Sequence, residues 1–205
     1  MASVSSAVLT GAVEGPADEA VLASVLQYVG LNLGEVHGLN GKDALLKALN
    51  GYNKAAAFSP WCVLVDMDRD LRCFRDILQD WLPTPAQLMR LRIVVREVEA
   101  WLFGDPERLS AFLGVPVSRI PANPEEVAQP KETMVSLAAR SRRRDIRHDM
   151  VPRPGSGRVV GPGYTSRLIE FTLDPDAGWR PDVAASNVDS LRRCITRLRE
   201  FLGHE

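Results

Sequence analysis

Short apolar runs alternate with helix-like segments through the first half of this 205-residue chain. A short apolar run bounded by turn residues is typical of a buried strand, whereas apolar residues three and four positions apart are typical of a helix. Because strands that alternate with helices pair in parallel, we expect an α/β fold with a mostly parallel sheet flanked by helices. The strands are expected at residues 6–13, 31–36, 61–65 and 91–95, and the helices at residues 18–28, 41–56 and 71–82.

The second half of the chain has a different pattern, with helical periodicity and no further strand signal. Residues 152–163 are rich in glycine and proline, which predicts a loop. We therefore predict a core domain at residues 1–115 and a mainly helical extension at residues 116–205 that packs on this core. The helices of the second half are expected at residues 105–113, 131–144, 164–173 and 187–202.

The composition is that of a globular protein, with 45% hydrophobic residues, 25% charged residues and a formal net charge of -1. Any contact with nucleic acid must therefore come from a local basic patch. The three cysteines form no CxxC pair, which argues against a disulfide framework and against structural zinc. No stretch has the length of a membrane span, and no basic and apolar secretion signal is present. The expectation is a cytoplasmic protein.

Acidic residues follow three of the four predicted strands. Glu14 follows the first strand, Asp66 and Asp68 follow the third, and Glu97 and Glu99 follow the fourth. Because ligands of parallel sheets bind beyond the carboxyl ends of the strands, we expect these residues to share one edge. Neighbouring carboxylates repel one another unless a cation lies between them, and carboxylate oxygens are the ligands that Mg²⁺ prefers. The pattern predicts a divalent-metal site.

The same acidic residues also have structural interpretations. Glu14 can be a polar residue at the point where the chain leaves a strand, and Asp66 and Asp68 can cap a helix that begins near Asp70. The acids after the fourth strand can be first-turn residues that a helix dipole favours. Haloacid-dehalogenase phosphatases and sugar-nucleotide transferases use a D-x-D pair as well, but neither explains the acids after the first and fourth strands.

Basic residues form one cluster between residues 140 and 158, where seven arginines against two aspartates give a local charge of +5. Such a cluster either contacts phosphates or forms a solvated helix face followed by a loop. Lys42 follows Gly41 at an expected helix start, where a phosphate can bind, although the pair lacks the P-loop pattern. The arginines of the cluster predicted to contact nucleic acid are Arg142, Arg143, Arg144 and Arg147.

These motifs resemble those of the TOPRIM superfamily, in particular small TOPRIM-like proteins related to the nuclease half of OLD-family proteins. The matching segments are residues 13–16, 65–68 and 95–102, and the resemblance covers roughly residues 8–105. In that superfamily a glutamate follows the first strand and a D-x-D pair follows the third. OLD-type members also carry an acid four residues after the first glutamate, where this chain has Asp18 instead of the commoner glutamate. Glu99 fits the acid of the downstream motif.

The resemblance implies a nuclease that hydrolyses phosphodiester bonds of DNA or RNA with Mg²⁺ or Mn²⁺. Glu14, Asp66 and Asp68 would be catalytic and hold the metal, and Asp18 and Glu99 would complete a second metal position. Arg96 or an arginine of the basic cluster would neutralise the scissile phosphate. Because the chain has no ATP-binding motif, the OLD resemblance suggests a separate partner ATPase, in defence or genome maintenance. The alternative is a non-catalytic TOPRIM-like module that binds metal or a partner.

Overall fold

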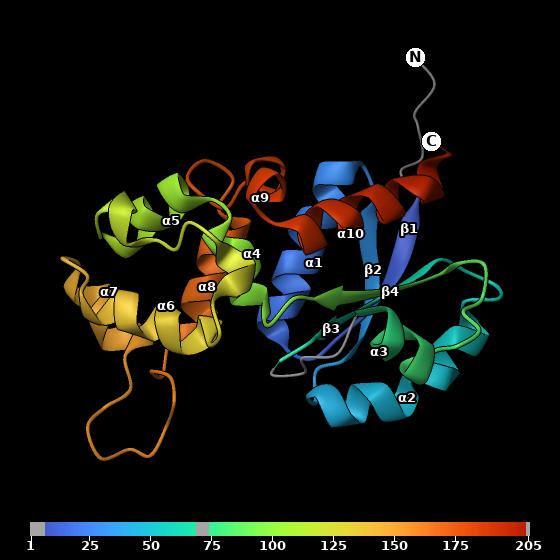
Figure 1. Ribbon diagram of the computed structural model, residues 1–205, viewed down its shortest axis with the longest axis horizontal. Coiled ribbons are helices and arrows are strands. Elements are labelled where there is room, and N and C mark those ends of the chain that lie inside the picture. Colours follow the sequence, from blue (N-terminus) through green and yellow to red (C-terminus); the bar gives the residue numbers. More distant parts are fainter. Residues whose placement is uncertain (1–6, 69–73, 204–205) are drawn as a thin grey trace. The chain divides into compact units, whose positions relative to one another are not determined.

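The computed structural model describes residues 7–68 and 74–203, and Figure 1 shows the path of the chain. The chain forms two compact units. The first unit runs to Val94 and resumes at Arg192, and the second unit spans Val95–Leu191. The first boundary thus lies directly after the last strand and ahead of residue 115, where the sequence places the end of the core.

The first unit contains a parallel sheet with the strand order β2-β1-β3-β4 among the residues described. Each neighbouring pair of strands is parallel, so the predicted α/β fold with a parallel sheet is confirmed. A helix follows each of the first three strands, as in repeated βαβ units. The elements are β1 (Val8–Val13), α1 (Pro16–Val29), β2 (Asn32–Gly38), α2 (Lys42–Ala55), β3 (Trp61–Asp66), α3 (Phe74–Trp81) and β4 (Met89–Val94).

Helices cover both faces of the sheet, with α2 and α3 on one face and α1 on the other (Figure 1). Every residue of β3 is buried, which explains why residues 61–65 form an unbroken apolar run ahead of Asp66. Val63 and Val65 pack with Leu45 and Leu49 of α2 in one apolar cluster. On the opposite face, Gly11 allows α1 to approach closely, because a Cβ atom there would lie 3.2 Å from Leu22.

The strand order places a topological switch point between β1 and β3. From β1 the chain crosses to β2 on one side, and β3 lies on the other side of β1. The loops after β1 and β3 therefore leave the sheet in different directions, and a crevice for ligands is expected between their carboxyl ends. Glu14 and Asp66 stand at these two ends.

The second unit is helical, as predicted for the C-terminal part of the chain. The helix expected at residues 131–144 is instead two helices, α6 and α7, so that prediction is wrong. Ser141 turns the chain between them, because its hydroxyl accepts a hydrogen bond from the Arg143 N–H at 2.9 Å. The elements are α4 (Val98–Phe103), α5 (Pro106–Leu113), η1 (Val117–Arg119), η2 (Pro124–Glu126), α6 (Pro130–Ala139), α7 (Arg144–Met150), α8 (Tyr164–Leu173) and α9 (Pro181–Asn187).

The C-terminal helix α10 (Asp189–Arg199) crosses the boundary between the units and continues into a short turn, η3 (Glu200–Leu202). Its buried apolar side chains recur at helical spacing, as expected for an apolar stripe; they are Leu191, Cys194, Ile195 and Leu198. No helix in the described part of the chain combines the length and the apolar character that a membrane span needs.

Candidate functional site

Two of the predicted site residues meet at the carboxyl ends of β1 and β3. Glu14 is the first residue after β1, and Asp66 is the last residue of β3. The Oε1 atom of Glu14 accepts a hydrogen bond from the backbone N–H of Asp66 at 2.8 Å. The glutamate therefore ties the two strand ends together at the switch point, and both residues lie at the same edge of the sheet.

Lys42 adds a cation to this edge. Its Nζ atom donates to the backbone oxygen of Asp66 at 2.6 Å and to Oδ2 of Asp68 at 2.7 Å. The Gly41 N–H donates to the Glu14 carbonyl oxygen at 3.0 Å, which fixes the start of α2 beside the end of β1. We call Glu14, Asp66, Asp68 and Lys42 the edge cluster. The sequence signal for Lys42 was a Gly-Lys pair at a helix start, but its aspartate partner could not be read from it.

Strained backbone is concentrated just beyond the strand ends. Among the residues described, three that are not glycine have a positive φ: Leu39 at 61°, Asp68 at 54° and Arg96 at 69°. Each comes one or two residues after a strand, namely β2, β3 and β4. A left-handed conformation costs an L-residue roughly 1–2 kcal/mol, and such strain is commonest at functional sites. For Asp68 this conformation accompanies its ion pair with Lys42.

Asp18 lies in the first turn of α1 and is only 8% exposed. A Cβ atom at Gly15 would stand 3.4 Å from its Oδ2 atom, so the carboxylate folds back toward the residue that follows Glu14. A carboxylate is favoured there because the helix N-terminus carries partial positive charge. This residue thus belongs to the same end of the sheet as the edge cluster.

The side chains of the edge cluster include suitable metal ligands, but these ligands do not converge on one point. Carboxylate oxygens are suitable ligands for Mg²⁺ or Mn²⁺. Within residues 7–68 and 74–203, however, no three histidine, cysteine, aspartate or glutamate residues are placed to hold a metal ion. One oxygen of Asp68 is bonded to Lys42 and one oxygen of Glu14 to a backbone N–H. A cation that takes Oδ2 of Asp68 would replace Lys42 there. Asp70, considered as part of a helix start, lies outside the described residues.

Glu99 belongs to the second unit and is almost completely buried, with 1% of its surface exposed. Its Oε1 atom accepts a hydrogen bond from the Tyr164 hydroxyl at 2.9 Å, and Lys131 Nζ stands 3.9 Å from it. No described residue forms a hydrogen bond with its Oε2 atom. Burial raises the pKa of this carboxyl, against the opposing effect of Lys131. Its assignment to the metal site of Glu14 stays a prediction.

Glu97 has a structural role instead. Its Oε2 atom accepts the backbone N–H of Lys131 at 2.8 Å, at the start of α6, so this carboxylate satisfies a free donor of that helix. The interpretation of Glu97 as a first-turn residue of its own helix is therefore wrong, because Glu97 precedes α4 and its side chain bonds to α6, whereas Glu99 does lie in the first turn of α4.

Of the arginines predicted to contact phosphates, some are bonded to other groups of the protein and others are exposed. Arg143 pairs with Asp145 at 2.7 Å and donates to the Phe112 carbonyl oxygen at 3.0 Å, and Arg147 donates to the Ser141 carbonyl oxygen. The hydrogen bond from Arg143 is the main reason that the pKa of Asp145 falls to about 2. Arg142 and Arg144 are exposed. The Nε of Arg96 is buried without a hydrogen-bond partner among the described residues.

Comparison of the chain with protein families, with characterised proteins and with solved structures gave no match. The TOPRIM resemblance therefore stays a prediction from the motifs.

Proposed function

We propose that the edge cluster hydrolyses phosphodiester bonds with the help of Mg²⁺ or Mn²⁺, as a nuclease of the TOPRIM and OLD type would. The observation that carries the proposal is that Glu14 and Lys42 both bond to Asp66 at the β1–β3 switch point, and that Lys42 also bonds to Asp68. It supports the proposal because acidic oxygens and a lysine are the groups that a metal-dependent phosphoryl site requires.

Glu14, Asp66 and Asp68 would hold the metal, and Asp18 would support them from the first turn of α1. When bound, the metal would activate a water molecule and stabilise the leaving oxygen. Lys42, exchanged from Asp68, would neutralise a phosphate oxygen as a point charge. The starts of α1 and α2 leave backbone N–H groups at this edge, where an anion is favoured.

The test measures Mn²⁺ affinity by calorimetry and cleavage of single- and double-stranded DNA and RNA. Asp68→Asn and Glu14→Gln should weaken metal binding and abolish cleavage. Lys42→Met should tighten metal binding, because it removes a competing cation, yet slow cleavage. Lys47→Met is the matched control, because Lys47 is exposed on the same helix. Cleavage that is unaffected by Asp68→Asn would refute the proposal.

The substrate class rests on the exposed arginines. We infer that Arg142 and Arg144 contact phosphates of DNA or RNA, whereas Arg143 and Arg147 mainly hold the fold. Replacing Arg142 and Arg144 with Ala should make the plot of log binding constant against log salt concentration less steep. The slope should decrease by about 0.9 for each phosphate contact that is lost. Metal affinity should stay unchanged. Absence of salt-dependent binding by the wild type would contradict this inference.

A second candidate is a non-catalytic module that binds a partner or a metal. Lys42 already pairs with Asp68 at 2.7 Å, which neutralises part of the negative charge of the edge cluster without a metal, and this observation favours the module. The two candidates differ in the metal titration: a module of this kind would show no cleavage with any metal, whatever its metal affinity. A separate ATPase partner and a cytoplasmic location are further parts of the nuclease proposal.

A further inference from the structure

The outer side of β4 is the last edge of the sheet in the described part of the chain. The carbonyl oxygens of Leu88 and Val94 accept hydrogen bonds from β3 and the residue after it, each at 2.9 Å. Because backbone groups alternate along a strand, Arg90 and Arg92 also face β3, and Leu91 and Ile93 direct their N–H and C=O groups outward. In the part of the chain that the structure describes, no strand pairs with this side of β4.

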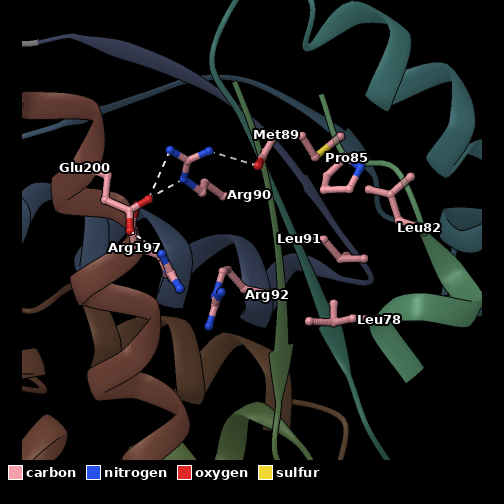
Figure 2. Close-up of a pocket in the computed structure, with 9 residues that line it drawn as sticks. All are labelled: Leu78, Leu82, Pro85, Met89, Arg90, Leu91, Arg92, Arg197 and Glu200. Carbon is pink, nitrogen blue, oxygen red and sulfur yellow. Dashed lines mark hydrogen bonds and ion pairs between the residues drawn. The ribbon is translucent and has the colours of Figure 1, made fainter. Parts of the chain in front are cut away.

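A groove of about 280 Å³ runs along this edge, and we call it the β4 groove. Figure 2 shows its two unlike walls, which lie on the two faces of the sheet. One wall is apolar and includes side chains of α3, and the other is charged and includes side chains of α10 and η3. The apolar wall consists of Leu78, Leu82, Pro85, Met89 and Leu91, and the charged wall consists of Arg90, Arg92, Arg197 and Glu200.

The charged wall has an excess of positive charge, with three arginines against one glutamate. Glu200 pairs with Arg90 at 3.2 Å and with Arg197 at 2.6 Å, and among the described residues that line the groove it is the only acid. Arg92 is 9% exposed, and its Nε–H has no acceptor among the residues described. A buried donor of this kind favours an incoming acceptor, because leaving it unsatisfied costs about 1–3 kcal/mol.

The thiols near Arg92 do not cancel its charge. Cys62 and Cys194 are both fully buried. Burial raises the pKa of both thiols, that of Cys194 to about 11, so both are neutral at physiological pH. The guanidinium of Arg92, which also hydrogen-bonds to the Cys194 thiol, therefore keeps its positive charge on this wall of the groove.

We propose that the β4 groove binds an extended segment of a partner protein as a fifth strand, in which apolar residues alternate with acidic ones. An added strand would accept hydrogen bonds from the outward N–H groups of Leu91 and Ile93 and donate to their outward carbonyl oxygens. Its alternate side chains continue the two faces of the sheet. The apolar side chains of the added strand would then contact the apolar wall, and its acidic side chains would contact Arg92 and Arg197 of the charged wall. This partner site is independent of the proposed nuclease function.

Charge also argues against a second copy of this chain as the occupant. In a symmetric pairing of β4 with β4, Arg90 and Arg92 of one copy would face the same residues of the other. Like charges opposite each other across strands are destabilising. A nucleic acid could pair with the arginines, but it would neither cover the apolar wall nor form hydrogen bonds with the outward backbone groups in the manner of a strand.

The experiment uses the full chain and capped peptides of about eight residues, a typical strand length, in which valine alternates with glutamate. Binding is measured by calorimetry, and amide hydrogen exchange is measured with and without peptide. The alternating peptide should bind and slow the exchange of the Leu91 and Ile93 amides. The Arg92 amide, already bonded to β3, serves as the internal reference. A peptide of the same composition with its valines and glutamates in separate blocks should bind much more weakly.

Arg197→Glu should weaken binding about tenfold, because attraction becomes repulsion at a side chain that is 59% exposed and tolerates replacement. Arg193→Glu is the matched control, because Arg193 is exposed on the same helix but does not line the groove. The proposal is overturned if no alternating peptide binds, if the block peptide binds equally well, or if Leu91 and Ile93 stay unprotected. Preferential binding of oligonucleotides or self-association through β4 would overturn it as well.

Discussion

Acidic side chains have unlike partners in the two units of this protein. In the first unit, Asp68 is half-exposed, and its partner is a single lysine. In the second unit, Asp105 is completely buried and accepts hydrogen bonds from Arg180 through Nε and Nη2, each at 2.8 Å, and from two backbone N–H groups. A lysine ammonium can be exchanged for another cation, whereas a forked arginine with backbone donors is a fixed structural partner. The exchangeable partner marks the candidate site.

The largest expected effect is on Asp105. Asp105→Ala should destabilise the fold by about 3–5 kcal/mol, because it leaves buried donors and the Arg180 charge without their acceptor. The matched control is Glu107→Ala, because Glu107 also bonds to Arg180 but its side chain is 78% exposed. The control should change stability by less than about 1 kcal/mol. Urea unfolding measures both, and equal costs for the two variants would break the contrast between the units.

The sequence predicted the sheet better than the site. The strands β1 and β3 were predictable because each contains a short apolar run followed by a turn, and the run of β3 matches a strand buried on both faces. Glu14 and Asp66 were placed at the sheet edge from this alternation alone. The strand order was not predictable, because it depends on tertiary packing rather than on any local pattern.

Two features were not predicted from the sequence: the break between α6 and α7, and the partners of Lys42 and Glu99. The break between α6 and α7 was missed because arginine favours helix, and only the hydroxyl of Ser141, bonded to the next turn, interrupts the pattern. The roles of Lys42 and Glu99 depend on partners far away in sequence, Asp68 and Tyr164. Spacing within one motif carries no information about such partners.

A second prediction concerns Glu99, the buried acid of the second unit. Because burial raises its pKa in the folded state, its favourable contribution is full below its usual value of 4.5 and is lost as pH rises through the folded pKa. Glu99→Gln cannot ionise, so the stability of this variant relative to the wild type should increase with pH. Unfolding at a series of pH values from about 4 to 8 measures this difference.

The control for Glu99 is Glu132→Gln, because Glu132 is exposed on α6. The same pH series for Glu132→Gln gives the effect of a glutamate-to-glutamine change on the surface. A flat difference for Glu99→Gln would show that the pKa of Glu99 is not raised in the folded protein. Adding Mn²⁺ sharpens the comparison: a metal bound at Glu99 would favour the ionised form and reduce the pH dependence of the wild type alone.

The smallest expected effect belongs to the Lys42–Asp68 pair, and it completes the contrast with Asp105. The side chains of Lys42 and Asp68 are 22% and 48% exposed, so a double-mutant cycle with Lys42→Met and Asp68→Asn should give a coupling below about 1 kcal/mol. In saturating Mn²⁺ the coupling should vanish, because the proposed metal replaces Lys42 at Asp68. A coupling of several kcal/mol that Mn²⁺ does not change would make this pair as structural as Asp105 and Arg180. The edge cluster would then be a fixed ion pair rather than a metal site.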